Sequence, residues 1–345
     1  MQIKLIEKQH QINKSLSVLY FTTDLNIGSK TLRCDMPAIY LNQLGHNAKT
    51  TIWLRFISET YLVKSWQDFD VFVFHRPTKP EVLEAIKAIK LKGKKIIVDN
   101  DDDYLHLPYE NPAWQGCKDK SDAIPTMLEC YRLADVVTVS TSSLADTIRP
   151  YNPNVVILEN CIDFELYKQP EEKKHKGLRI GWTGMDRPSD ISIVANVVDQ
   201  ICDEYSEVSL FIGGDPATLK HFKTDKKYFM NYVLPCDYHK MLREIDIGIV
   251  PLVDNKFNDA KSDLKGLEFA SQGIPFIASP SASYRQFADS CSANMLAKRS
   301  KDWKRMLVRL IEDKKYREEL GNKQYEYTKS RDIKKNIDKW IQIYS

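Results

Sequence analysis

The chain has 345 residues, which predicts two domains at the usual size of roughly 100–200 residues each. Hydrophobic residues make up 43% and charged residues 28%, a composition that excludes a disordered or fibrous protein. No apolar run approaches the ~18 residues that cross a membrane, and the first residues lack the apolar core of a signal peptide. The seven cysteines form no CxxC pair, which argues against a disulfide framework or zinc ribbon and favours a reducing cytoplasm.

The first half of the chain alternates between short apolar runs and longer stretches with helical spacing. Residues 80–91 illustrate the helical spacing, because Val82, Ala85, Ile86 and Ile89 fall on one face. Most of the short runs are apolar throughout, as the strands of a parallel sheet covered by helices on both faces must be. The predicted strands are Ser17–Phe21, Lys49–Trp53, Asp70–His75, Lys94–Asp99, Asp135–Ser140 and Val155–Leu158.

The same alternation restarts after residues 168–177, a hydrophilic segment that predicts a linker. The last ~45 residues are expected to be helical, with core spacing at Trp303, Met306, Leu307 and Leu310. The strands predicted in the second half are Leu178–Trp182, Val208–Ile212, Tyr228–Leu234, Asp246–Pro251 and Ile274–Ser279.

These patterns predict an α/β protein with two Rossmann-like, doubly wound domains that face each other across a cleft. Ligands are expected in the loops that follow the strands. The net charge of +3 is unevenly distributed, because residues 296–345 hold 15 Lys/Arg against 8 Asp/Glu. This excess is typical of solvated helix faces, and nucleic acid or a membrane surface is the alternative partner.

The loop Thr22–Arg33 follows the first strand and opens a helix. It offers Gly28, Lys30 and Arg33 to an anion. The order Gly28-Ser29-Lys30-Thr31 lacks the earlier glycine of a phosphate-binding loop, which excludes a P-loop kinase or ATPase.

The corresponding loop of the second half is Ile180–Asp190. Gly181 and Gly184 allow a ligand close to the backbone, and Arg187 adds a positive charge. The pattern predicts either a diphosphate cradle or a tight turn with a helix cap. Neither this loop nor residues 212–215 matches GxGxxG, which disfavours a dinucleotide-dependent oxidoreductase.

An acidic run, residues 99–110, follows the fourth strand. Asp99, Asp101, Asp103 and Glu110 match EF-hand spacing, but Tyr104 occupies the position that needs glycine. A D-x-D pair that holds a divalent cation is a second interpretation. We favour a third, in which the loop faces the cleft and one carboxylate contacts an acceptor hydroxyl; crowding is then expected to raise the pKa of at least one acid.

Two further groups are candidates for chemistry. His75 ends the third strand, where a structural and a cleft role are about equally expected. The spacing predicts that one helix face carries Lys261, Lys265 and Glu268, at gaps of four and three. This face is either a surface charge pattern or a binding site. In a binding site, the carboxylate would accept hydrogen bonds from ribose hydroxyls and the lysines would neutralise a diphosphate.

The segment Lys261–Ser279, KSDLKGLEFASQGIPFIAS, resembles the S-x-K-x-x-E-[YF]-x-A-x-G-x-P-[VI]-[IV]-A-[ST] block of the large group-one family of retaining, nucleotide-sugar-dependent glycosyltransferases with the GT-B fold. Shorter similarities occur in the same order at Gly28–Arg33, Leu41–His46, Ile157–Asp163 and Ile180–Gly184. The acidic run, with Pro108–Pro112 after it, looks like a subgroup that includes phage-like sequences.

This resemblance implies roles for individual residues. Glu268 would bind the donor ribose, His75 would contact the transferred sugar, and the chain end from Arg331 would cross back to the first domain. Apart from the resemblance, we expect one carboxylate of Asp99–Asp103 to orient the acceptor, with Asp99 and Asp101 as the candidates. The remaining residues implied in donor binding are Gly28, Arg33, Gly181, Thr183, Gly184, Arg187, Lys261 and Lys265.

The sequence departs from the family at one point. The family often carries two glutamates eight positions apart, and the first would fall at Ala260. Asp259 or Asp263 is the expected substitute, and Asp263 is our candidate for the catalytic carboxylate.

The expected function is therefore transfer of a sugar from a UDP- or GDP-linked donor to an acceptor hydroxyl, with retention and without an obligatory metal. A glycan, lipid or protein is expected as the acceptor, and a hydroxymethylated base in DNA is a further candidate. The alternatives are an epimerase or phosphorylase of the same fold and a non-catalytic sugar-nucleotide-binding protein. The expected domains are residues 1–165, residues 166–330 and a returning helix at 331–345.

Overall fold

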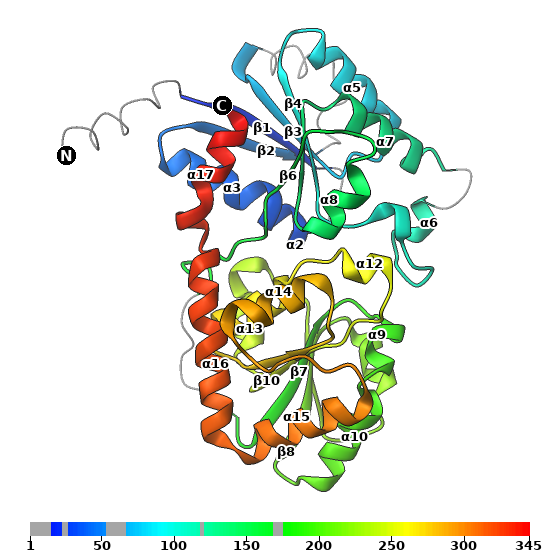
Figure 1. Ribbon diagram of the computed structural model, residues 1–345, viewed down its shortest axis with the longest axis vertical. Helices are drawn as coiled ribbons and strands as arrows, with labels where there is room; N and C mark the ends of the chain where they lie inside the picture. The colour runs from blue at the N-terminus through cyan, green and yellow to red at the C-terminus, as the bar shows by residue number, and fades with distance from the viewer. Residues whose placement is uncertain (1–14, 23–26, 53–66, 118–120, 168–174) are drawn as a thin grey trace, which may run out of the picture.

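Two parallel sheets, each covered by helices, lie one above the other along the long axis of the molecule (Figure 1). The computed structural model describes residues 15–22, 27–52, 67–117, 121–167 and 175–345. The first sheet has the strand order β2-β1-β3-β4-β5-β6 and the second has the order β11-β10-β7-β8-β9. Every pair of adjacent strands in the described residues is parallel. The α/β class with two Rossmann-like domains is therefore confirmed.

All eleven predicted strands are present, with ends that shift by a few residues. The predicted residues Tyr232, Val233 and Leu234 are not part of β9, which ends at Asn231. Trp53 and most of the predicted linker lie outside the described residues. The strands are β1 (Ser17–Thr22), β2 (Asn47–Ile52), β3 (Val71–His75), β4 (Lys95–Asn100), β5 (Val136–Val139), β6 (Val155–Ile157), β7 (Leu178–Gly184), β8 (Val208–Gly214), β9 (Lys227–Asn231), β10 (Ile247–Val250) and β11 (Phe276–Ala278).

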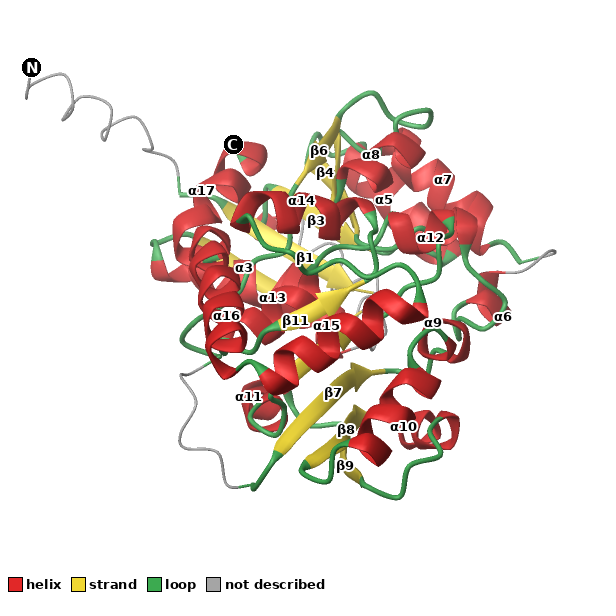
Figure 2. Cartoon of the chain, turned by 60° about the horizontal axis from the view of Figure 1, so that its bottom comes forward, coloured by secondary structure: helices red, strands yellow, loops and turns green. Residues whose placement is uncertain are grey.

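Helices cover both faces of each sheet, as Figure 2 shows. Those of the first half are α2 (Ile27–Lys30), the π-helical η1 (Thr31–Asp35), α3 (Met36–Gln43), α5 (Pro80–Lys90), η3 (Tyr104–His106), α6 (Trp114–Cys117), α7 (Ala123–Leu133) and α8 (Ser142–Ile148). Those of the second half are α9 (Pro188–Ser192), α10 (Ala195–Glu204), η4 (Pro216–His221), η5 (Pro235–Asp237), α11 (Tyr238–Leu242), α12 (Lys256–Asp259), α13 (Leu264–Ser271), α14 (Ala282–Cys291) and α15 (Ser300–Glu312).

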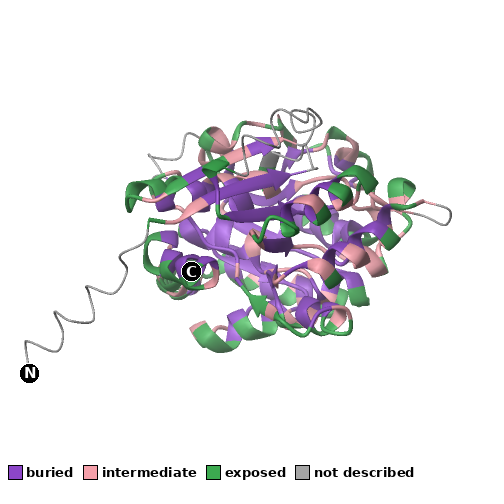
Figure 3. Ribbon diagram, turned by 90° about the horizontal axis from the view of Figure 1, so that it is seen from above, coloured by how far each residue is buried: buried purple, intermediate pink, exposed green. Residues whose placement is uncertain are grey.

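Burial explains why the strand sequences are apolar throughout. All five residues of β3 are buried, and so are all four of β10. Helix α5 buries the four apolar residues of its predicted face in the core cluster that includes residues of β3. The buried strands form the interior of the first half in Figure 3. A sheet covered on both faces leaves only its strand ends open to a ligand.

The strand order reverses at one point in each sheet. In the first sheet β1 lies between β2 and β3, and Thr22 pairs with both Ile52 and His75. In the second sheet β7 lies between β10 and β8. Loops diverge at such reversals and leave a crevice beyond the carboxyl ends of the strands. The two reversals place Ser29 and His75 in one half, and Gly184 and Arg187 in the other, next to the space between the domains.

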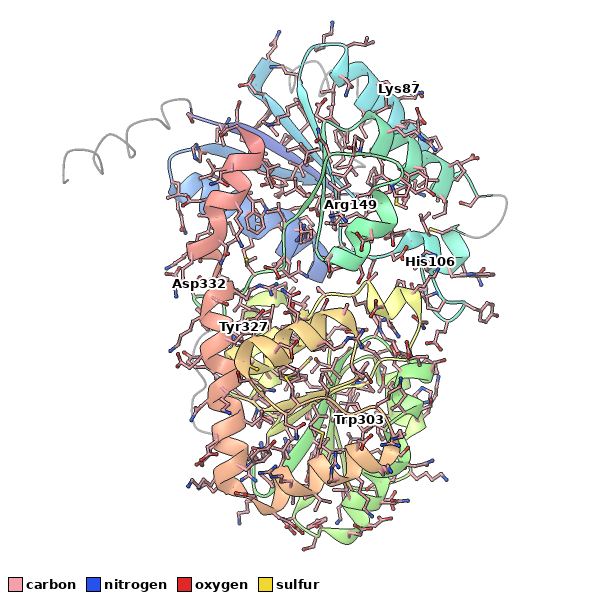
Figure 4. The ribbon with its side chains drawn as sticks, in the orientation of Figure 1. Lys87, His106, Arg149, Trp303, Tyr327 and Asp332 are labelled. Atoms are coloured by element: carbon pink, nitrogen blue, oxygen red, sulfur yellow. The ribbon has the colours of Figure 1, made fainter. Side chains whose placement is uncertain are left out.

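The C-terminal helices return to the first half of the molecule. Helix α16 (Lys314–Thr328) runs along the second half, η6 (Lys329–Arg331) follows it, and α17 (Ile333–Tyr344) packs on α3. Tyr327 and Asp332 lie on either side of this crossing (Figure 4). The return was predicted and is confirmed; the boundaries after residues 165 and 330 stay predictions. Among the described residues, no helix has both the length and the apolar character needed to cross a membrane.

Helix α17 is part of the first core rather than a surface addition. Trp340 is 3% exposed and packs in one cluster with Val18, Tyr20 and Leu41. The hydroxyl of Tyr20 also donates to that of Tyr344 at 2.9 Å.

We expect Trp340→Ala to lower the free energy of unfolding of the first domain by about 3–5 kcal/mol, since a large buried ring is lost and a cavity remains. Urea unfolding followed by circular dichroism measures the change. Lys339→Ala, at an exposed position of the same helix, is the control and should stay within ~0.5 kcal/mol of the parent chain. Equal midpoints for Trp340→Ala and the parent would contradict the packing of α17 on this core.

Candidate functional site

A cavity of about 1120 Å³ lies between the two domains, at the carboxyl ends of both sheets. Its lining comes from both halves of the chain, so the site exists only when both domains are folded. The residues that carry polar or backbone groups to its surface and matter below are Gly28, Ser29, Arg76, Asp101, Asp102, Thr183, Gly184, Arg187, Gly214, Tyr238, Lys261, Lys265 and Glu268.

Glu268 is the centre of a hydrogen-bonded group on the second-domain wall. Its carboxylate accepts from Lys265 Nζ at 2.8 Å, from the Tyr238 hydroxyl at 3.0 Å and from the Tyr167 hydroxyl at 3.3 Å. Thr183 Oγ1 lies 2.8 Å from the same Tyr238 oxygen. Burial, followed by the charge of Glu268, raises the pKa of both tyrosines well above the usual value, so they remain neutral donors.

Backbone rather than side chains forms the wall next to this group. Gly184 and Gly214 end β7 and β8 and pair with each other. Their φ angles are +132° and +110°, a region that L side chains rarely adopt. A Cβ on Gly214 would lie 2.5 Å from the Gly184 carbonyl oxygen. The two glycines therefore leave a flat surface that a ligand can approach closely.

Three cations, Lys261, Lys265 and Arg187, lie on the same wall. Lys261 lies above the ring of Phe257, 4.2 Å from its centre, and 3.6 Å from a carboxylate oxygen of Asp102. Burial lowers the pKa of Lys261 to about 8; Asp102 opposes this shift and the charge of Arg187 adds to it. Cations that repel each other in a cavity favour a bound anion.

A buried ion pair stands behind the first-domain wall. Asp99, on β4, accepts from Arg33 Nε at 3.0 Å and Nη2 at 2.5 Å, and from Thr138 Oγ1 at 2.6 Å. His75 Nδ1 lies 3.0 Å from the second carboxylate oxygen. Burial favours the protonated acid, but the charge and hydrogen bonds of Arg33, with those of His75, outweigh it and lower the pKa of Asp99 to about 2.

Arg76 holds the next two carboxylates of the acidic run. Its Nε donates to Asp101 at 2.5 Å and its Nη2 to Asp102 at 2.9 Å. Arg76 itself has a φ of 50°, in the left-handed region that costs a non-glycine residue free energy. Despite burial, the arginine lowers the pKa of Asp101 below its usual range.

The raised pKa expected in the acidic run is wrong for Asp99 and Asp101. Each carboxylate has its own arginine, and the attraction exceeds the repulsion between neighbouring acids. Arg33 contacts both oxygens of Asp99, whereas the two oxygens of Asp101 accept from Arg76 and Ser29, so the oxygens of this D-x-D pair already have partners. Within the described ranges, no three His, Cys, Asp or Glu side chains are arranged to hold a metal ion.

The structure brings most of the predicted site residues into one cavity. Those on its surface are Gly28, Asp101, Thr183, Gly184, Arg187, Lys261, Lys265 and Glu268. The predicted residues that lie behind that surface are Arg33, His75, Asp99, Gly181 and Asp263. Their roles stay predictions, but each has a structural partner.

Gly181 and Asp263 have partners that explain their residue types. A Cβ on Gly181 would lie 2.3 Å from Ile245 Cγ1, so this glycine lets a packed side chain reach the sheet. Asp263 Oδ2 accepts from Arg331 Nη1 at 3.1 Å, and burial raises the pKa of Asp263. Both residues support the wall rather than face the cavity.

The position of the missing glutamate is buried between the domains. Ala260 is 2% exposed and belongs to the core cluster of the first half. Its carbonyl oxygen accepts from Thr141 Oγ1 at 2.8 Å. The other proposed substitute, Asp259, accepts from the backbone N–H of Ala282 at 2.9 Å. A longer side chain at residue 260 would separate the two halves, which is a physical reason for alanine there.

Sequence reasoning missed Tyr167, Tyr238, Gly214 and Ser29. The tyrosines are 101 and 30 residues from the Glu268 that they contact, and neither belongs to a motif. Gly214 stood in a Gly-Gly pair that was considered only as a dinucleotide fingerprint. Ser29 was visible as a polar residue in the first loop, but nothing in the sequence placed it against His75.

Comparison with solved structures identifies the fold. HepE of Anabaena, in complex with UDP-glucose, is 12% identical with a TM-score of 0.69 over 95% of this chain and 100% of that chain. Sucrose-phosphate synthase of Thermosynechococcus elongatus is 11% identical with a TM-score of 0.67 over 95% and 98%. A putative UDP-N-acetylglucosamine 2-epimerase of Listeria monocytogenes is 9% identical with a TM-score of 0.59 over 95% of both chains.

These similarities show that the chain has the GT-B fold, with two facing Rossmann-like domains. Comparison by sequence finds no match, either to a protein-family model or to a curated protein.

The ion pair of Asp99 predicts a pH dependence of stability. The pKa of Asp99 is about 2 in the folded chain against ~3.9 when unfolded, so the ionised acid stabilises the fold above about pH 4. That contribution is lost as the pH falls towards 2. Relative to Asp99→Asn, the parent chain should lose about 2 kcal/mol of unfolding free energy between pH 5 and pH 2.

Urea unfolding at several pH values measures this difference, with the exposed Asp289→Asn as the reference. A constant gap between parent and Asp99→Asn across this range would contradict the lowered pKa.

Proposed function

We propose that the chain is a glycosyltransferase that moves a sugar from a nucleoside-diphosphate sugar to an acceptor hydroxyl, with retention of configuration. The observation that carries the proposal is the second-domain wall, where Lys261, Lys265 and Arg187 face the same cavity as the glycine surface and Glu268. Cations beside exposed backbone suit a diphosphate, and a carboxylate among hydroxyl donors suits a ribose.

Each group has a part in this proposal. The diphosphate lies over Gly184 and Gly214, between Lys265 and Lys261. The Glu268 carboxylate accepts hydrogen bonds from the two ribose hydroxyls. These replace the hydrogen bonds that it accepts from Tyr167 and Tyr238 in this structure.

The difficult step is departure of the diphosphate, whose negative charge grows as the bond to the sugar breaks. Fixed cations in a cavity stabilise that charge without reorganisation, and one such group contributes about 3–4 kcal/mol. In this proposal side chains supply the positive charge, so no metal is required.

The fold neighbours support a uridine donor in particular. HepE is described in complexes with UDP and with UDP-glucose. We therefore propose a UDP-linked sugar as the first donor to test and a GDP-linked sugar as the second.

The acceptor is proposed to be a hydroxyl compound that enters beside the first-domain wall. Asp101 and Asp102 lie on that wall, which favours an acceptor without phosphate groups near the reacting hydroxyl. Support for DNA is confined to the basic excess at the chain end, and steep loss of transfer with salt would distinguish this acceptor.

We place the protein in the cytoplasm because all seven cysteines are free thiols.

Substitution of the donor wall tests the proposal. We expect Glu268→Gln and Lys265→Ala to lower nucleotide release from the preferred donor by about 100-fold or more, since each removes a charged contact to the donor. The assay follows UDP or GDP release from UDP-glucose, UDP-N-acetylglucosamine, UDP-galactose and GDP-mannose. Lys323→Ala, at an exposed site on α16, is the control.

Parent-like release by both variants would exclude this site. Conversion of the donor to an isomeric sugar without transfer would favour the epimerase, sugar phosphate formed from a glycoside and phosphate would favour the phosphorylase, and tight UDP binding without turnover would favour the binding protein.

The pKa of Lys261 predicts how UDP binding depends on pH. Lys261 is charged below about pH 8 and loses its proton above it, so affinity for the diphosphate should fall as the pH rises from 7 to 9. We expect a loss of about 10-fold in the parent chain and a smaller loss in Lys261→Met. Isothermal titration calorimetry with UDP measures both; identical pH dependence in the two proteins would remove Lys261 from the diphosphate site.

A further inference from the structure

Ser29 presents an oxygen to the cavity from the first-domain wall. It lies on α2, just after the first strand, and is half-buried on the cavity surface. Its Oγ donates to Asp101 Oδ2 at 2.7 Å and lies 3.0 Å from His75 Nε2. His75 is fully buried and does not reach the cavity. A ligand can therefore contact Ser29 and Asp101 on this wall, but not His75.

The hydrogen bonds determine what Ser29 offers to a ligand. Asp99 is ionised and can only accept, so the Nδ1 of His75 carries a proton and donates to it. If His75 also carries a proton on Nε2, it donates to Ser29, whose own proton goes to Asp101. If Nε2 is bare, both acceptors compete for the Ser29 proton. In either state Asp101 or His75 takes the Ser29 proton, so Ser29 has a lone pair rather than a proton to offer to a ligand.

An oxygen with only lone pairs exposed selects a hydrogen-bond donor. A sugar hydroxyl can donate to it, whereas a phosphate oxygen would be repelled. The site also lies close to the cations of the opposite wall. Arg76 holds both Asp101, the partner of Ser29, and Asp102, which is 3.6 Å from Lys261.

We infer that Ser29 Oγ accepts a hydrogen bond from a hydroxyl of the sugar being transferred, and that Asp101 and His75 orient it for that purpose. The inference rests on the proposed function, since it requires a diphosphate on the second-domain wall and its sugar in the part of the same cavity that Ser29 lines. Ser29 is then a catalytic residue that touches the donor. His75 is a positioning residue that acts through Ser29, rather than the direct sugar contact expected from the sequence.

Ser29→Ala tests the first part. Turnover of the donor that the panel above selects should fall by about 10-fold, the loss that removal of one neutral hydrogen bond produces. The affinity for UDP, measured by calorimetry, should not change, because Ser29 does not touch the nucleotide. Ser192→Ala, whose hydroxyl bonds a backbone carbonyl of α9 away from the cavity lining, is the matched control.

Monodeoxy analogues of that donor identify the partner hydroxyl. One analogue should lower turnover by the parent chain as much as Ser29→Ala lowers it with the complete sugar. That analogue should show no further loss with Ser29→Ala, whereas the others should lose equally in both proteins. Independent losses with every analogue, or full turnover by Ser29→Ala, would overturn the inference.

Two substitutions separate positioning from packing at His75. His75→Asn keeps an amide near Asp99 but removes the nitrogen that faces Ser29, while His75→Gln places an amide near Ser29. We expect a loss of turnover in His75→Asn, partial rescue in His75→Gln, and no effect of His75→Asn in the Ser29→Ala background. Additive losses would assign His75 to structure alone and overturn its positioning role.

The same experiments keep the two proposals apart. A parent chain that neither binds UDP nor releases nucleotide from any donor of the panel overturns the proposed function and this inference with it. A parent chain that turns over, with Ser29→Ala at the same rate, overturns the inference alone.

Discussion

The site depends on a continuous set of buried polar contacts that passes from one domain to the other through Asn160. Arg33, bound to Asp99 on β4, also donates to the carbonyl of Leu158 and to the side chain of Asn160. Asn160 in turn donates to Ser262 Oγ at 2.8 Å, and its carbonyl accepts from Arg331 at 2.6 Å. A buried guanidinium without these partners would be strongly unfavourable, so the connection between the domains must keep this geometry.

Charge is divided unequally between the two walls of the cavity. The first-domain wall carries carboxylates that arginines already neutralise, while the second-domain wall carries Lys261, whose pKa is lowered by burial and by the charge of Arg187 against the opposing charge of Asp102. A dianionic ligand relieves this repulsion. A hydroxyl-rich group has no such reason to prefer the second wall, and the lone pairs at Ser29 and Asp101 suit it. The asymmetry therefore orients a molecule that has a charged end and a sugar end.

Ala260 is one of the places where the two halves of the chain are in contact. Its burial in the first core, with the Thr141 hydrogen bond to its carbonyl, fixes one edge of the cavity. Glu110 bonds the backbone N–H of Ser189 at 3.2 Å, a second bridge between the halves. Arg331, on the side of the returning helix, donates to the carbonyl of Asn160 at 2.6 Å, a third contact between the halves. The larger, charged side chain of a glutamate at residue 260 would not fit in this buried edge, which is a physical reason for alanine at that position.

The sequence by itself determined the strands and the parallel sheets, because both depend on local apolar spacing that can be counted along the chain. The return of the last helix to the first domain followed only from the resemblance to a known family. It also singled out the segment Lys261–Ser279 as a candidate site. The predicted common helix face holds for Lys265 and Glu268 on α13, whereas Lys261 precedes that helix. Only the tertiary structure decided which candidates face the cavity. His75, Asp99 and Arg33 are withdrawn behind Ser29, and Tyr238 is brought to Glu268. Such pairings join residues tens to a hundred positions apart, and burial decides between them through contacts that no local pattern encodes.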